Sequence, residues 1–155
     1  MNLADAKKSL PPHIWGEAEK QAGRSTLTRH KTGAVVFNKD FEIISKGCSY
    51  HVGFGAKPTV HAEENALSAF RGADSAIGLD LLVYAVGRNR PSYSSRPCYA
   101  CLGKIVKVGI GRVLYLERMN DGEYILNIET PNELNNRSLE SNFRLNSYAR
   151  EMRII

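Results

Sequence analysis

The spacing of apolar residues along the chain changes between two periods, which predicts an α/β fold. Apolar residues at helical spacing follow Pro11-Pro12 and predict a helix over residues 13–23, whose inner face carries Ile14, Trp15, Ala18 and Ala22. Clusters of β-branched and aromatic residues predict strands over 32–37, 41–46, 81–86, 112–116 and 124–128. The turn residues Asn38-Lys39-Asp40 join the first two strands, which predicts a hairpin.

Two more helices are predicted, one from residue 61 and one over residues 98–108. The first has a small apolar face and a stop signal at Gly72; that face carries Ala62, Ala66, Ala69 and Phe70. The second points Leu102, Ile105 and Val106 inward. Residues 1–10 have the pattern of a polar lead-in, and residues 131–148 that of a loose amphipathic helix. The loop over 47–58 is rich in glycine, which suggests a backbone that wraps a ligand.

Reactive side chains stand at the predicted starts of these two helices. His61, Cys98 and Cys101 supply three ligands that suit zinc and leave its fourth tetrahedral position open for water. The two cysteines are three residues apart, so both sulfurs can face one ion from a single helical turn. Glu63 follows His61 by two residues, close enough to reach the metal-bound water without being a ligand.

Each of these residues also has a simpler interpretation. The cysteine pair alone could be a redox motif, and His61 alone could be an ordinary surface or core histidine. A purely structural zinc site would be closed by a fourth protein ligand. Glu63 alone is typical of the first turn of a helix. Because the residues occur together in the same strand and helix context, we favour the hypothesis of a catalytic zinc.

The two motifs carry a resemblance to a known family. His61-Ala62-Glu63, followed by Pro97-Cys98-Tyr99-Ala100-Cys101, is similar to the H-x-E and P-C-x-x-C motifs of zinc nucleobase deaminases. The chain thus resembles the cytidine deaminase superfamily over about residues 29–129. The resemblance implies a three-layer cytidine-deaminase-like α/β fold, with a mixed five-stranded sheet and helices on both of its faces. We expect a single domain of this kind over residues 1–155.

The resemblance also implies roles for individual residues. His61, Cys98 and Cys101 are expected to bind Zn²⁺, and Glu63 to carry protons. By analogy with relatives, the backbone of Ala62 would approach the pyrimidine carbonyl, and the carbonyl of Arg96 the exocyclic amine. Relatives commonly place an asparagine after the second strand, where it contacts the sugar. The candidates here for that contact and for other substrate contacts are Ser49, His51, Asn38, Arg88 and Arg90.

Features outside the two motifs point to different subfamilies. Thr32-Gly33-Ala34-Val35-Val36 is similar to the first strand of deoxycytidylate and tRNA-adenosine deaminases. The short turn Asn120-Asp121-Gly122 instead suggests an antiparallel fifth strand, as in free cytidine deaminases and blasticidin deaminases. The stretch over residues 95–115 is most similar to members from phages and large DNA viruses.

The composition of the chain indicates which class of partner and which cellular compartment we expect for the protein. The formal net charge of +5 favours an anionic partner, either a nucleotide phosphate or a polynucleotide. Two of the three cysteines are assigned to the metal, so Cys48 has no cysteine left with which to form a disulfide. The lack of a disulfide framework favours a reducing, cytoplasmic setting. No apolar run approaches the roughly 20 residues of a membrane span, so we expect no membrane partner. The resemblance further implies a homo-oligomer.

Two enzymatic functions follow from the resemblance. The first is hydrolytic deamination of cytosine in free (deoxy)cytidine nucleosides or nucleotides such as dCMP, in which Glu63 transfers protons from water to the ring nitrogen and the departing ammonia. The second is editing of cytosine, with adenine as a weaker candidate, in single-stranded DNA or RNA. The loop Arg88-Asn89-Arg90-Pro91-Ser92-Tyr93 favours the second, because it interleaves arginine with an aromatic residue. A non-catalytic binding protein is the remaining alternative.

Overall fold

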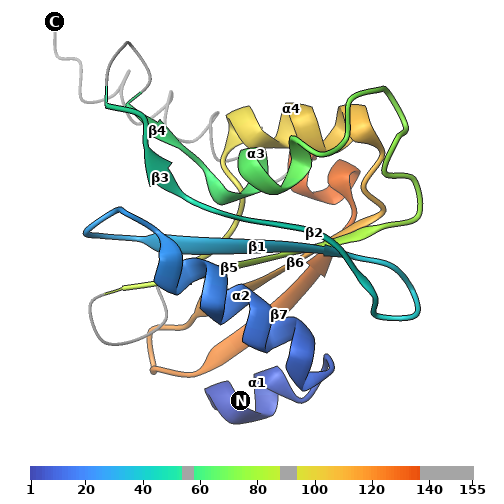
Figure 1. The fold of residues 1–155 in the computed structure, drawn as a ribbon. Coiled ribbons are helices and arrows are strands. Elements are labelled where there is room, and N and C mark those ends of the chain that lie inside the picture. Colours follow the sequence, from blue (N-terminus) through green and yellow to red (C-terminus); the bar gives the residue numbers. More distant parts are fainter. Residues whose placement is uncertain (54–57, 88–93, 137–155) are drawn as a thin grey trace, which may run out of the picture.

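A mixed five-stranded sheet forms the centre of the computed structural model, which describes residues 1–53, 58–87 and 94–136 (Figure 1). The strands are β1 (Lys31–Phe37), β2 (Ile43–Cys48), β5 (Asp80–Val86), β6 (Arg112–Arg118) and β7 (Tyr124–Glu129), and their order across the sheet is β2-β1-β5-β6-β7. Only β5 and β6 pair in parallel; the other neighbours are antiparallel. The predicted hairpin and the predicted antiparallel fifth strand are therefore both confirmed.

Helices cover both faces of the sheet and make the expected three layers (Figure 1). The helices α1 (Leu3–Lys7) and α2 (Pro12–Arg24) pack on one face, and α3 (Ala62–Leu67) and α4 (Tyr99–Val108) pack on the other. Successive residues of a strand point to opposite faces, so β1 serves both cores. Val35 and Phe37 join the core under α2, whereas Ala34 and Val36 join the core under α3 and α4.

Two glycines let helices approach the sheet closely from opposite sides. A Cβ on Gly33 would lie 2.2 Å from the carbonyl oxygen of Ala18 in α2. A Cβ on Gly47 would lie 2.6 Å from the backbone nitrogen of Ala66 in α3. Both neighbours are helix backbone, which cannot turn aside as a flexible side chain can, so only glycine fits at these two positions.

The N-terminal segment differs from the prediction of a polar lead-in. Residues 3–7 form α1, which buries Ala6, and Leu10 beyond it is also buried. So few apolar residues do not form a pattern long enough to predict a helix. In the structure, however, they pack in the same core as Trp15. Tertiary packing therefore stabilises a helix that is too short to be stable alone.

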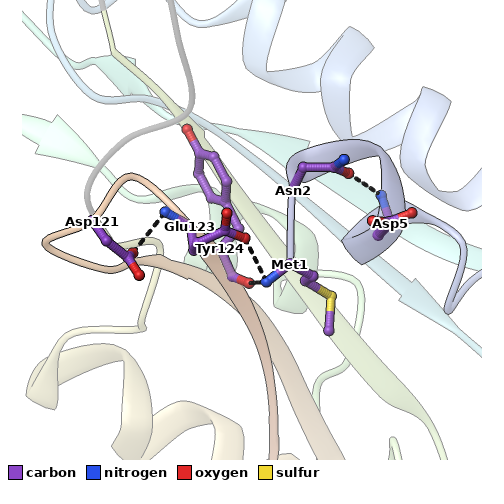
Figure 2. Close-up of polar contacts among 6 residues, drawn as sticks. All are labelled: Met1, Asn2, Asp5, Asp121, Glu123 and Tyr124. Carbon is purple, nitrogen blue, oxygen red and sulfur yellow. Dashed lines mark hydrogen bonds and ion pairs between the residues drawn. The ribbon is translucent and has the colours of Figure 1, made fainter.

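The N-terminus is held against the end of the sheet next to β7, as Figure 2 shows. The side chain of Asn2 caps α1 by accepting a 2.8 Å hydrogen bond from the backbone N–H of Asp5. The backbone N–H of Tyr124 donates to the carbonyl of Met1 at 2.7 Å, and the amino group of Met1 forms an ion pair with Glu123 at 2.7 Å. The contacts of Met1 with Glu123 and Tyr124 join residues that are more than 120 positions apart in the sequence.

Two predicted boundaries around the second strand were wrong. The strand begins at Ile43 rather than residue 41, because Phe41 has a positive φ of 59° in the turn. The predicted loop over 47–58 contains structure: residues 47–48 complete β2, and β3 (Tyr50–His51) pairs with β4 (Thr59–Val60). Strands of two residues are below the length at which a pattern can be recognised.

The predictions for the helices needed smaller corrections. Helix α3 ends at Leu67 rather than near Gly72. Of the predicted inner face, Ala62 and Ala66 are buried in the core and Phe70 packs against it, whereas Ala69 is exposed. In α4, Leu102 and Ile105 face inward as predicted, but Val106 is 51% exposed. Residues 131–136 are helical, and the rest of the helix predicted over 131–148 lies outside the described residues. Within the described part of the chain, no helix has the length and apolar character needed to span a bilayer.

Candidate active site

Two neighbouring helices bring their N-terminal ends together, and each carries a predicted ligand there. His61 is the N-cap of α3 and Cys98 is the N-cap of α4; both have extended backbone angles, with φ near −75° and −73°. Cys101 lies in the first turn of α4 and is buried. The position at a helix N-terminus favours negative charge, which suits cysteines that must bind a metal as thiolates.

The distances between the three donor atoms fit a tetrahedral zinc site. Nδ1 of His61 lies 3.3 Å from Sγ of Cys98 and 3.3 Å from Sγ of Cys101. Zinc bonds of about 2.3 Å to sulfur and about 2.0–2.1 Å to nitrogen place such atoms about 3.6 Å apart in a tetrahedron. All three donor atoms lie within 4.8 Å of one another, and no fourth His, Cys, Asp or Glu of the described residues joins them. The donor set therefore leaves one position open, as a catalytic zinc requires.

The two thiols have strongly different proton affinities in the metal-free protein. A hydrogen bond from Cys101 is the main reason that the pKa of Cys98 falls to about 5, and nearby His61 lowers it further. The hydrogen bond to Cys98 and burial together raise the pKa of Cys101. A bound cation deprotonates such thiols outright, so Cys98 and Cys101 would hold zinc as thiolates.

Glu63 and Glu64 are adjacent but occupy different surroundings. Glu63 is only 4% exposed and lines the cavity beside the cluster, and its burial raises the pKa of its carboxyl group. Glu64 turns back along the helix, where its Oε1 lies 3.5 Å from the backbone nitrogen of His61. This is the arrangement of a capping box at the start of α3. Of the two acids, Glu63 is therefore the one in position to act on a bound molecule.

A cavity of about 250 Å³ lies next to the cluster. Most of the lining comes from the connection from α2 into β1, the start of α3, β5 and the segment before α4, and single residues come from just after β2 and from β4. The lining residues are Leu27, His30, Thr32, Ser49, Thr59, His61, Ala62, Glu63, Val83, Ala85, Ser94, Ser95, Arg96 and Cys98. The cavity therefore offers an apolar wall from β5 and several hydroxyl groups around a buried carboxyl group.

Comparison with known families agrees with this geometry. The family model described as "Cytidine and deoxycytidylate deaminase zinc-binding region" matches residues 13–117, which include the three donors and Glu63. The chain belongs to this deaminase family. It is accordingly a zinc-dependent deaminase, a hydrolase, with His61, Cys98 and Cys101 placed to hold the zinc. A search of curated proteins found no match. The resemblance to viral members, the cytoplasmic setting and the homo-oligomer stay predictions.

The structure brings three of the predicted substrate contacts of the deaminase to the cavity. Ala62, Ser49 and Arg96 all line it. His51 is exposed in β3 and does not belong to the cavity lining. Asn38 lies in the turn between β1 and β2, where its side-chain oxygen accepts hydrogen bonds from two backbone N–H groups of the turn at 3.0 and 2.9 Å. The structure does not bring Asn38 to the cavity, because the turn uses its side chain.

The arginines predicted to contact the substrate are only partly described. Arg88 and Arg90 lie outside the described residues. The guanidinium of Arg96 donates a 3.2 Å hydrogen bond to the carbonyl of Leu134, so this side chain ties the segment before α4 to the helical residues 131–136. The same segment is fixed to β6, because the hydroxyl of Ser95 accepts a 3.0 Å hydrogen bond from the backbone of Leu116.

Sequence reasoning missed several residues that line the cavity of the deaminase. His30 comes from the connection between α2 and β1 and Thr32 from the start of β1, whereas Thr59 and Ser94 come from the segments before the two metal helices. His30 has a positive φ of 52°, which is uncommon for a residue other than glycine. The available signal was a polar stretch with four basic residues and no acid over 24–31, but the sequence did not place it beside the metal motifs.

Proposed function

We propose that this deaminase acts on cytosine in free (deoxy)cytidine nucleosides or nucleotides such as dCMP. Water replaces the exocyclic amine, so the products are the corresponding uracil compound and ammonia. The main support is the size of the cavity beside Glu63. Its volume of about 250 Å³ is just below the 300–1,000 Å³ of pockets for drug-sized ligands, which suits one nucleoside unit.

In this proposal Glu63 moves the protons. Its carboxyl group is buried and its pKa is raised, which is the usual way in which a protein prepares a carboxyl group both to accept and to release a proton near neutral pH. It takes one proton from the attacking water and delivers it to the ring nitrogen; it then takes the second proton from the hydroxyl group formed on the ring carbon and delivers it to the amine, which leaves as ammonia. The carbon–oxygen bond forms at the ring carbon that carries the amine, and the carbon–nitrogen bond then breaks.

The remaining residues of the site hold the reactants in place. Zinc, when bound, supplies Lewis-acid activation of the water. His61, Cys98 and Cys101 hold the metal at the N-termini of two helices that are packed on the same face of the sheet. Ala62 and Arg96 both line the cavity, and their backbone groups are proposed to bind the polar edge of the base. Valine and alanine side chains of β5 form the apolar wall of the cavity.

The experiment is a measurement of ammonia release from cytidine, deoxycytidine, CMP, dCMP and single-stranded DNA and RNA oligonucleotides by the zinc-loaded protein. We expect turnover of at least one monomer. Glu63→Gln should abolish turnover and keep zinc, whereas Glu64→Gln keeps a capping oxygen and should retain most of the activity. Turnover of oligonucleotides without turnover of any monomer would contradict the proposal and support editing.

The arginines test whether the preferred monomer carries a phosphate. If Arg88 or Arg90 binds the phosphate, its replacement by alanine should raise KM for dCMP and spare deoxycytidine. Arg96→Ala should instead lower the stability of the protein, because the guanidinium holds residues 131–136. If all three replacements weaken oligonucleotide binding equally and binding falls steeply with salt, the polynucleotide alternative is favoured.

A further inference from the structure

A second cavity lies between α1 and the first half of α2 (Figure 1). Its volume of about 530 Å³ falls within the 300–1,000 Å³ that is usual for pockets that bind small organic molecules. Its walls are mostly apolar and include Ala4, Leu10, Pro12 and Trp15. It shares no lining residue with the cavity beside Glu63, so the two cavities are separate.

Trp15 brings a hydrogen-bond donor without a partner to the wall of this cavity. The residue is 3% exposed, and none of the described residues accepts a hydrogen bond from its indole N–H. Buried polar groups are nearly always paired, because an unpaired one costs free energy that an acceptor would recover. An edge-to-face contact with Tyr84 of β5, at 6.1 Å between ring centroids, holds the indole in place. Trp15 is therefore a fixed donor that lacks an acceptor in the protein itself.

Gly16 adds to the open space of the cavity. It lines the cavity from inside α2, where glycine is a poor helix former compared with alanine. A Cβ at this position would meet no atom within 4 Å, so close packing of the protein does not require glycine here. A longer side chain would instead take up part of the free space. The glycine thus leaves room for a ligand at a cost to the stability of the helix.

The charged residues of the cavity favour an anionic head group. Its lining contains Lys7, Lys8 and Glu19, which leaves one positive charge in excess. Lys7 forms an ion pair with Glu19. The side chain of Lys8 is 79% exposed and pairs with Asp5 at 3.4 Å. Because an exposed ion pair contributes little to stability, the ammonium group of Lys8 is available to a ligand.

We propose that the cavity between α1 and α2 binds a small monocarboxylate with an apolar body. The carboxylate supplies the acceptor for the indole N–H of Trp15 and a negative charge for Lys8, and the apolar body packs against Leu10 and Pro12. This binding site goes beyond the proposed function, since it involves none of the residues of the active site. The outcome of its test is therefore independent of which substrate the enzyme deaminates.

The test is titration of the zinc-loaded protein with octanoate and with octylammonium, which share an apolar chain and differ in the head group. Trp15 is the one tryptophan of the chain, so its fluorescence reports on this cavity directly, and calorimetry gives the affinity and the stoichiometry. We expect octanoate to bind at one site per chain and to change the fluorescence of Trp15. Octylammonium has no acceptor and should bind at least about 10-fold more weakly.

Variants of two neighbouring residues test the donor and the space separately. Trp15→Phe keeps an aromatic ring and loses the N–H, so calorimetry should show about 10- to 100-fold weaker binding of octanoate, the effect of one hydrogen bond to a charged group. The affinity for octylammonium should change little. Gly16→Leu should fold, because leucine is the better helix former, and should abolish binding of octanoate by filling the cavity.

Gly23→Leu is the matched control for Gly16→Leu. Gly23 also lies in α2 with no atom within 4 Å of its Cβ position, but it does not line the cavity, so this variant should bind octanoate like the wild type. The inference is overturned if the wild type binds neither probe or both equally, if Trp15→Phe keeps the affinity for octanoate, or if Gly16→Leu still binds it. Self-association of the wild type that Gly16→Leu abolishes would assign the cavity to a second copy of the chain and would also overturn the inference.

Discussion

Replacement of Gly47 by alanine tests whether the close contact between β2 and α3 sets the geometry of the active site. The new Cβ would lie 2.6 Å from the backbone nitrogen of Ala66 and 2.8 Å from Cβ of Asn65. Ordinary contacts begin at 3.4 Å, so α3 has to withdraw by about 0.8 Å. That helix carries Glu63 and begins at His61. A misplacement of about 1 Å can cost about 100-fold in rate, so we expect kcat/KM to fall about 10- to 100-fold.

The same change should also destabilise the fold. Overpacking of a core typically costs about 1–3 kcal/mol in the free energy of unfolding. Two hydrogen bonds that fix α3 on β2 would be stretched: the hydroxyl of Ser45 donates to the carbonyl of Ala66 at 2.5 Å, and the side-chain amide of Asn65 donates to the carbonyl of Cys48 at 3.1 Å. Urea denaturation of the zinc-loaded protein measures the free energy of unfolding, and ammonia release measures kcat/KM of the folded fraction.

Two other glycines provide matched controls. A Cβ on Gly103 in α4 would meet no atom within 4 Å, so Gly103→Ala should keep activity and stabilise the helix by up to about 1 kcal/mol. Gly33→Ala clashes with α2 on the opposite face and should lower stability with a smaller effect on kcat/KM. If Gly47→Ala is destabilised but retains kcat/KM within about twofold of the wild type, the contact does not position α3 and the reasoning is refuted.

Three further predictions concern the metal and the stability of the fold. Cys98→Ala should lose stoichiometric zinc by metal analysis, whereas Cys48→Ser should keep both zinc and activity; the reverse pattern would show that the ligand set is wrong. The pKa of Glu17 is lowered by a hydrogen bond from Gln21 and by Lys46 at 3.1 Å, so its ionised form stabilises the fold above the unfolded-state value of about 4.5. Glu17→Gln should therefore be less stable than the wild type by up to about 1 kcal/mol at pH 7, and this difference should disappear in urea titrations as the pH falls through the lowered pKa of Glu17.

The sequence by itself predicted the five central strands, the helices α2, α3 and α4, and the three candidate metal ligands that the structure brings together. The ligands were predictable because each lies at a helix start and two of them are one turn apart, so local spacing already restricts where their donor atoms can point. The central strands were predictable because their apolar runs are long enough to distinguish them from loops. The H-x-E motif also predicted Glu63 rather than Glu64 as the catalytic residue; Glu63 lines the cavity, and its role in proton transfer stays a prediction.

Tertiary structure decided the features that depend on contacts between distant residues. Helix α1 forms because Ala6 packs in the same core as α2. Val106 faces outward because the way α4 lies on the sheet determines which of its side chains point inward. The pairing of Ser25 with Ser49 requires the end of α2 to meet the end of β2, which no local pattern specifies. Spacing along the chain fixes directions within one turn of a helix, whereas only close packing of several elements fixes which buried groups share a hydrogen bond or a cavity.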